Sequence, residues 1–235
     1  MNKSILITGA SKGIGAATAW HFWENENTVQ EFILLARESK DFDSLIEDLK
    51  KNNPYNKKVT PYFIDLADRD ALVGLMSEIY EAHGNVDILL NNAGYTAPCA
   101  LQQISFKNFE RTISVNLYAP FTVVQELLHQ GNVFKVILNV ASTAGINGRS
   151  GWLTYSASKA AVINMSEVMR EELAIYGTRV VCLAPGRCAT GLRRKLAPDE
   201  DPTAIMQPEH VAEVVDMLCS EAGRFIDSQR IVVRL

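Results

Sequence analysis

Thr8-Gly9-Ala10-Ser11-Lys12-Gly13-Ile14-Gly15 is the stretch that decides the fold of this 235-residue chain. It follows an apolar run and opens a segment of helical periodicity. Glycine has no Cβ atom, so glycines at such a turn let the backbone approach a pyrophosphate closely, and the helix start adds free N–H groups and a positive dipole end. The turn lacks the Gly-Lys-Ser/Thr ending of an ATP-binding P-loop. A tight strand-to-helix turn without a ligand is the alternative interpretation.

Short apolar runs alternate with longer segments of helical periodicity along the whole chain. The predicted strands are Ile5–Thr8, Phe32–Ala36, Val59–Ile64, Ile88–Leu90, Val136–Val140, Val180–Ala184 and Ile231–Val233. The predicted helices are Ile14–Glu24, Asp41–Lys51, Asp70–His83, Phe109–His129, Tyr155–Tyr176 and His210–Glu221. Because the strand runs are continuously apolar, they predict a parallel sheet that helices cover on both faces.

The expected fold class is therefore α/β, a Rossmann-type doubly wound parallel sheet of about seven strands. Pro61 interrupts the third run, and proline cannot donate to a strand ladder, so this strand should lie at an edge. The strand order 3-2-1-4-5-6 of dinucleotide-binding sheets places strand three there. The polar segment Ala197–Pro208 predicts a mobile loop within one domain that spans residues 1–235.

Composition and charge exclude several classes of protein. The chain is 47% hydrophobic with a formal net charge of −4, and both signs are scattered, so we expect no nucleic-acid or membrane partner. The four cysteines form no Cys-x-x-Cys pair, which predicts reduced thiols and no metal site. The first apolar run begins at Ile5 and no apolar stretch approaches roughly 20 residues, so we expect neither a signal peptide nor a membrane span, and a cytoplasmic location.

Several motifs in order along the chain resemble those of the short-chain dehydrogenase/reductase family. The glycine-rich turn is similar to its Thr-Gly-x-x-x-Gly-x-Gly signature, and Asn91-Asn92-Ala93-Gly94 is similar to its second signature. The positions similar to its catalytic set are Asn116, Ser142, Tyr155 and Lys159, and Pro185-Gly186 is similar to a further family turn. The resemblance covers nearly the whole chain. It is closest in kind to the single-domain branch of 3-oxoacyl-[acyl-carrier-protein] reductases and related carbonyl reductases.

The pair Tyr155 and Lys159 is the core of the predicted chemistry. The two residues are four apart on a predicted helix, so their side chains share one face. A tyrosine pKa lies near 10, and we expect the lysine ammonium to lower it toward neutrality. Ser142 is expected to hold the substrate oxygen against Tyr155, and the resemblance assigns to Asn116 a water of the proton relay. A single helical tyrosine, or a single serine after a strand, is more often structural, so the prediction rests on the combination.

The resemblance implies hydride transfer between a nicotinamide and a carbonyl or alcohol carbon, with Tyr155 as the general acid or base. The expected cofactor-binding residues are Gly9, Ser11, Lys12, Gly13, Ile14, Gly15, Arg37, Asp65, Leu66, Asn92, Ala93, Gly94, Tyr155, Lys159, Pro185, Gly186, Cys188 and Thr190. Within this set the resemblance implies that Asp65 contacts the adenine amino group and Thr190 the carboxamide; the alternative for Asp65 is a plain residue near the N-cap of the following helix.

The cofactor predicted from the end of the second strand is NADP(H). Family members that use NAD carry an aspartate there, whereas this chain has Ala36 followed by Arg37, and Lys12 adds a second cation. The alternative is that both cations are solvated surface charges. Glu38 leaves a further alternative open, because it could reach the ribose if the strand ends one residue later.

The substrate is not determined by these motifs. Arg187 and the segment Leu192–Leu196, with Arg193, Arg194 and Lys195, should form part of a lid, and Arg149 could add to a cationic entrance that selects an anionic substrate. A solvated helix face is the equal alternative. The candidates are a 3-oxoacyl thioester, another keto compound or a keto-sugar, and the different class is a non-catalytic NADP(H)-binding regulator on the same fold. The resemblance also implies a homodimer or homotetramer.

Overall fold

A seven-stranded parallel sheet forms the centre of the protein, and its order is β3-β2-β1-β4-β5-β6-β7. We describe a computed structural model that covers residues 2–25, 28–226 and 230–235. The strands are β1 (Lys3–Thr8), β2 (Val29–Ala36), β3 (Lys58–Phe63), β4 (Ile88–Asn91), β5 (Val136–Val140), β6 (Arg179–Pro185) and β7 (Arg230–Val233). Every pairing between neighbours is parallel. The predicted fold class and strand order are confirmed.

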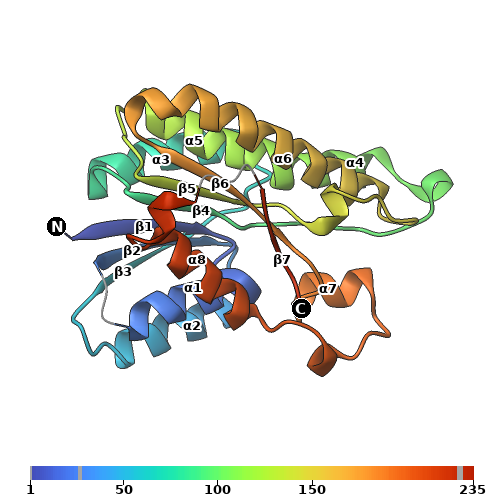
Figure 1. Cartoon of the computed structure of the whole chain (residues 1–235), viewed down its shortest axis with the longest axis horizontal. Coiled ribbons are helices and arrows are strands. Elements are labelled where there is room, and N and C mark those ends of the chain that lie inside the picture. Colours follow the sequence, from blue (N-terminus) through green and yellow to red (C-terminus); the bar gives the residue numbers. More distant parts are fainter. Residues whose placement is uncertain (1, 26–27, 227–229) are drawn as a thin grey trace.

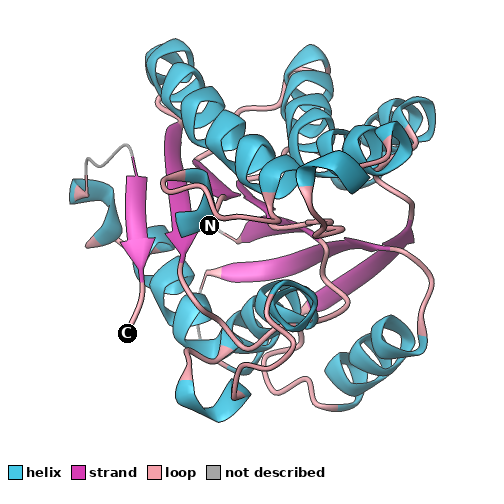
Figure 2. Ribbon diagram, turned by 90° about the vertical axis from the view of Figure 1, so that its right-hand side faces the viewer, coloured by secondary structure: helices cyan, strands magenta, loops and turns pink. Residues whose placement is uncertain are grey.

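Helices cover both faces of this sheet (Figures 1 and 2). The helices are α1 (Gly13–Glu24), α2 (Lys40–Lys51), α3 (Arg69–His83), α4 (Phe106–Ile113), α5 (Ala119–His129), α6 (Leu153–Leu173), α7 (Gly191–Leu196) and α8 (Pro208–Cys219). In Figure 1, α1, α2 and α8 lie on one side of the sheet, and α3, α4, α5 and α6 lie on the other. Among the described residues, no helix has both the length and the apolar character that crossing a membrane requires.

Two hydrophobic clusters fill the spaces between the sheet and these two layers. Side chains alternate across a strand, so Ile5 and Ile7 of β1 belong to the cluster under α1, α2 and α8, where Trp23 is fully buried. Leu6 belongs to the cluster under α3 and α5, together with Met76. Both faces of β1 are therefore buried, which is why its sequence is continuously apolar.

The edge position predicted for the third strand is confirmed. β3 pairs only with β2 among the described strands, in a register that sets Pro61 opposite Leu34. Because the outer side of an edge strand needs no ladder, a proline there costs no strand pairing.

The helical segment predicted over Phe109–His129 is confirmed, but it is not one regular α-helix. The segment divides into α4, a π-helical turn over Ser114–Tyr118, and α5. Pro120 lies in the first turn of α5 and has no N–H to donate to the carbonyl four residues earlier, that of Asn116. The helical ladder therefore cannot continue unchanged through Asn116, and the chain widens into a π-turn there.

Candidate active site

The glycine-rich turn joins β1 to α1 at the carboxyl edge of the sheet. Gly9 and Gly13 have φ angles of +68° and +59°, which favour glycine. A Cβ atom at Gly9 would lie 2.7 Å from the Cα of Ala93, and one at Gly15 would lie 2.5 Å from the carbonyl oxygen of Gly9. The N-cap residue Lys12 makes no side-chain cap. The first N–H groups of α1 are therefore available to an anion.

Hydrogen bonds join this turn to the segment Asn92-Ala93-Gly94 that follows β4. The Thr8 hydroxyl accepts the N–H groups of Asn92 and Ala93, each at 3.1 Å. The Asn92 side chain donates to the carbonyls of Thr8 and Gly9, also at 3.1 Å. β1 and β4 are neighbours at the point where the strand order reverses, which is where open α/β sheets bind ligands. The structure thus brings the two predicted cofactor segments together.

Ser142, Tyr155 and Lys159 converge beyond the end of β5. Ser142 begins a short 3-10 turn after that strand, while Tyr155 and Lys159 lie on α6. Ser142 acts on the Tyr155 phenol, where it opposes the rise in pKa that burial causes. Lys159 Nζ lies 6.0 Å from the centre of the Tyr155 ring and donates to the carbonyl of Val140 at 2.7 Å. A Cβ atom at Gly145 would lie 2.6 Å from the backbone carbon of Lys159, so glycine lets α6 approach this turn.

Asn116 lies in the π-turn and is 1% exposed. Its Oδ1 accepts the N–H of Tyr95 at 2.7 Å. Its Nδ2 donates to the Tyr95 carbonyl at 3.0 Å and to the Ser158 hydroxyl at 2.9 Å. Ser158 in turn donates to the carbonyl of Tyr155 at 2.8 Å. The Asn116 side chain therefore ties the segment after β4 to the helix that carries Tyr155, a structural role that the sequence did not reveal.

The ionisation of Tyr155 differs from the sequence-based prediction. Burial raises its pKa, and Ser142 and the charge of Arg193 oppose that rise. Burial also lowers the pKa of Lys159, to about 8. The Tyr155 pKa is thus raised and not lowered as expected, because burial outweighs the opposing effects. The phenol is held in its protonated form.

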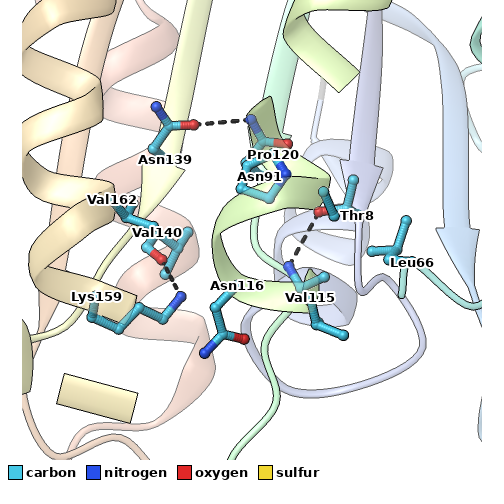
Figure 3. A pocket seen from close by; sticks show the side chains of 12 residues that line it. Thr8, Leu66, Asn91, Val115, Asn116, Pro120, Asn139, Val140, Lys159 and Val162 are labelled. Atoms are coloured by element: carbon cyan, nitrogen blue, oxygen red, sulfur yellow. Dashed lines mark hydrogen bonds between the residues drawn. The ribbon is translucent and has the colours of Figure 1, made fainter. Parts of the chain in front are cut away.

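A small cavity lies behind this group, between β1, β4, β5 and α6 (Figure 3). Its volume of about 10 Å³ is room for roughly one water molecule. Asn116 and Lys159 border it, and Asn91 donates to Asn139 at 2.9 Å across it. Leu66, one of the predicted cofactor residues, closes another side. The buried amides and the ammonium give this interior a polar lining within the apolar sheet.

The cations expected to bind a 2′-phosphate lie at the end of β2 and at the start of α1. Arg37 and Glu38 are both exposed directly after β2. Ser39 caps α2 by accepting the N–H of Phe42 at 3.3 Å. Lys12 Nζ lies 3.7 Å from a carboxylate oxygen of Asp41, and both side chains are largely exposed, so this ion pair is weak.

Asp65 follows β3 and has a partner that the sequence did not reveal. One carboxylate oxygen accepts the N–H of Ala67 at 3.1 Å, and the other pairs with Arg111 of α4 at 2.7 Å. Burial alone would raise the pKa of Asp65, but Arg111, Ala67 and Arg37 together lower it. The Arg111 guanidinium also lies 5.3 Å from the Tyr95 ring. Asp65 is therefore a carboxylate fixed in place from two elements.

The loop after β6 brings the remaining predicted residues to the same edge. Pro185 ends β6, and Gly186 donates to the Val233 carbonyl at 2.8 Å. Cys188 is buried, and its backbone forms an isolated parallel β-bridge with Met206. The Thr190 side chain caps α7 by accepting the N–H of Arg193 at 3.1 Å. Two further predicted residues, Ser11 and Ile14, lie in the glycine-rich turn and at the start of α1, where Ile14 packs near Cys188.

The cations of the expected lid are partly neutralised within the lid itself. Arg193 forms two bonds with Glu200, at 2.5 and 2.7 Å, and Arg187 lies 3.5 Å from the same carboxylate. The guanidinium groups of Arg193 and Arg149 lie 5.5 and 5.7 Å from the ring of Trp152. Glu200 and Trp152 were both missed in the sequence, since neither occupies a position in a motif.

Comparisons with known proteins agree with this architecture. The sequence model of the family described as short chain dehydrogenase matches residues 3–201. A 3-oxoacyl-[acyl-carrier-protein] reductase of Thermotoga maritima is 34% identical over 97% of this chain and 94% of its own.

Two solved structures have the same fold. The 4-hydroxyisoleucine dehydrogenase complexed with NADH has a TM-score of 0.81 and 26% identity over 99% of this chain and 96% of its own. A Burkholderia cenocepacia short chain dehydrogenase in complex with NADP has a TM-score of 0.85 and 23% identity over 98% and 96%. With the family model matching most of the residues, the chain belongs to the short-chain dehydrogenase/reductase family and is an oxidoreductase of that family.

Proposed function

We propose that this oxidoreductase reduces a carbonyl compound with hydride from NADPH and a proton from Tyr155, or oxidises the matching alcohol with the same residues. The observation that carries the proposal is the convergence of Ser142, Tyr155 and the buried Lys159 at the carboxyl edge of the sheet, beside the glycine-rich turn. In this proposal the residues 1–235 act as one domain, which the single continuous sheet supports.

The residues around the glycine-rich turn fit a dinucleotide cofactor. A side chain at Gly9 or Gly15 would meet backbone atoms within 3 Å, and the start of α1 has no side-chain cap. A nicotinamide cofactor supplies the hydride when it is bound. The residues that we propose to hold it are Gly9, Ser11, Lys12, Gly13, Ile14, Gly15, Arg37, Asp65, Leu66, Asn92, Ala93, Gly94, Tyr155, Lys159, Pro185, Gly186, Cys188 and Thr190.

The proton chemistry belongs to residues of the chain. The raised pKa of Tyr155 keeps its hydroxyl protonated at neutral pH, as a proton donor must be. Ser142, which acts on the same phenol, is the hydroxyl that we propose to donate to the substrate oxygen. The Lys159 ammonium donates to the Val140 carbonyl. It is the cation of α6 that we propose to stabilise the negative charge that develops on the Tyr155 oxygen. Asn116 holds α6 in position through Ser158.

The proposal is tested by turnover. The purified protein would be given NADPH and a β-ketoacyl thioester, a keto-sugar nucleotide, an α-diketone or an aromatic aldehyde, with absorbance of the nicotinamide as readout. We expect reduction that Tyr155→Phe abolishes and that Tyr176→Phe, at a 64% exposed tyrosine, preserves. The identity of the Thermotoga relative supports the thioester as the first substrate to try. Tight NADPH binding without turnover on any substrate would favour a non-catalytic regulator.

The preference for NADP(H) is a separate part of the proposal. Arg37 and Lys12 are cations at the end of β2 and the start of α1, and Ala36 supplies no carboxylate there. Each charge-assisted bond to a phosphate contributes about 1.5–3 kcal/mol. Arg37→Ala should therefore weaken NADPH binding roughly 10–100-fold and leave NADH binding unchanged, whereas the control Lys51→Ala should change neither. Tighter binding of NADH by the unaltered protein would instead make Glu38 the ribose ligand.

We also propose that the protein is a homodimer or homotetramer, with a second copy covering α4, α5 and α6. These helices and the π-helical turn between α4 and α5 expose large apolar side chains: Phe106 83%, Tyr118 54%, Phe121 43%, Leu153 42% and Val168 49%. Exposed apolar groups on neighbouring helices favour an interface. Light scattering should give a multiple of 26.0 kDa, which Phe121→Glu should reduce, and a monomeric mass would contradict it.

We place the enzyme in the cytoplasm, where its four free cysteines stay reduced.

A further inference from the structure

Helix α7 lies across three parts of the proposed site. At its start, the Thr190 methyl group lies 3.2 Å from where a Cβ atom of Gly13 would be. A Leu192 methyl group lies at the same distance from such an atom on Gly94. The Arg193 guanidinium lies 5.5 Å from the ring of Trp152. One short helix therefore touches the glycine-rich turn, the segment after β4 and the residue that precedes α6.

Arg193 differs from the other cations of α7 in being held on two sides. Its Nε and Nη2 atoms bond to both oxygens of Glu200, at 2.5 and 2.7 Å, and each side chain of the pair is only 17% exposed. Two parallel charge-assisted bonds fix the plane of a guanidinium group as well as its position. The face of the ring of Trp152 attracts the same cation. Arg194 and Lys195, by contrast, are exposed.

Trp152 connects this arrangement to Tyr155. It is the N-cap residue of α6, three residues before Tyr155. Arg193, seated on this ring, is thereby held at the start of the helix that carries Tyr155, and its charge opposes the rise in the Tyr155 pKa that burial causes. Whatever holds Arg193 therefore also holds α7 against Trp152, three residues before Tyr155.

We propose that Arg193 is a positioning residue that, paired with Glu200 and seated on Trp152, latches α7 closed over Tyr155. The kinetic part of this inference rests on the proposed function. Because Glu200 occupies the Nε/Nη2 edge of the guanidinium and balances its charge, Arg193 in this proposal holds the lid and does not receive a substrate anion. A neutral and an anionic carbonyl substrate should therefore depend on the latch to the same degree.

Limited proteolysis tests the latch without any turnover. Three consecutive trypsin sites, Arg193, Arg194 and Lys195, lie on α7 itself. Glu200→Gln keeps the shape of the side chain and weakens the pair, so cleavage at these sites should become about tenfold faster, since cleavage follows the open population. Asp199→Asn, an exposed neighbour with the same charge change, should cleave at the original rate. Equal rates for the two variants would overturn the latch.

Steady-state kinetics at saturating NADPH test the link to catalysis. Glu200→Gln and Arg193→Gln should raise KM about tenfold for a neutral and for an anionic ketone alike, with a smaller change in kcat. Arg193→Lys, which keeps the charge but loses the fork, should recover only part of the loss. Arg194→Gln, the matched control on the same helix, should behave as the original protein. A Glu200→Gln protein that gains activity on the anionic ketone alone would show that Arg193 is an anion receptor, which refutes the latch. An absence of turnover in the original protein would refute the proposed function and leave the proteolysis result to stand.

Discussion

Thr8→Val and Thr18→Val remove the same hydroxyl from two buried threonines and should change stability in opposite directions. The Thr8 hydroxyl accepts two backbone N–H groups, those of Asn92 and Ala93. The Thr18 hydroxyl, on α1, is fully buried and has no hydrogen-bond partner among the residues that the structure describes. An N–H left unpaired costs about 1–3 kcal/mol, and both donors are only partly buried, so Thr8→Val should cost about 2–4 kcal/mol. Replacing an unpaired buried hydroxyl with a methyl group should stabilise by about 1 kcal/mol.

The assay is equilibrium unfolding in urea, followed by far-ultraviolet circular dichroism at one protein concentration, because oligomerisation makes apparent stability depend on concentration. The midpoint should fall for Thr8→Val and rise slightly for Thr18→Val, with the slope m unchanged. Thr8→Val should also weaken NADPH binding, since it loosens the segment that begins at Asn92. Equal destabilisation by both substitutions would refute the reasoning, because it would mean that the two accepted hydrogen bonds contribute nothing.

Two further predictions concern buried ionisable groups. Burial lowers the Lys159 pKa from 10.5 to about 8, so at pH 7 a charged lysine costs folding on the order of 3 kcal/mol, and Lys159→Met should stabilise the protein while abolishing turnover. This advantage should fade in urea titrations as pH rises from 8 to 10.5, because the unfolded chain then binds more protons than the folded one and the original protein gains stability. Burial raises the thiol pKa to about 11 in Cys182 and Cys188 and to about 12 in Cys219. A thiol reagent at pH 8 should therefore label Cys99 rapidly and these three cysteines only after denaturation.

The sheet could be predicted because its signal is local. The five inner strands, β1, β2, β4, β5 and β6, are short, mostly apolar and buried on both faces, so their composition distinguishes them from the amphipathic helices between. Pro61 carried topological information as well, because the chemistry of proline admits few positions in a sheet. The glycine-rich turn could be predicted as well, because the positions of Gly9 and Gly15 leave no space for a side chain and only glycine fits there.

The contacts that were missed are those between distant residues of no special type. Arg111 reaches Asp65 across 46 positions, and nothing in either segment points to the other. The cations of α7 were visible, but the carboxylate that neutralises Arg193 lay in a loop with no periodicity to place it. The π-helical turn at Asn116 did have a signal in the sequence, the proline four residues later. The apolar periodicity continues on both sides of it, however, and predicted one regular helix.

The state of Tyr155 shows why spacing alone cannot determine the chemistry of a pair. A lysine four residues later guarantees a shared helix face but not the direction of the ammonium, which here bonds to the carbonyl of Val140. Burial then dominates both groups: it keeps the phenol protonated and disfavours the charge on the lysine. In the proposed reaction Lys159 would favour negative charge on the phenol oxygen as the proton leaves, because a poorly solvated cation gains most from an anion that forms nearby. The buried charge of Lys159 therefore lowers stability and has a proposed role in catalysis. A variant that removes this charge should gain stability and lose turnover.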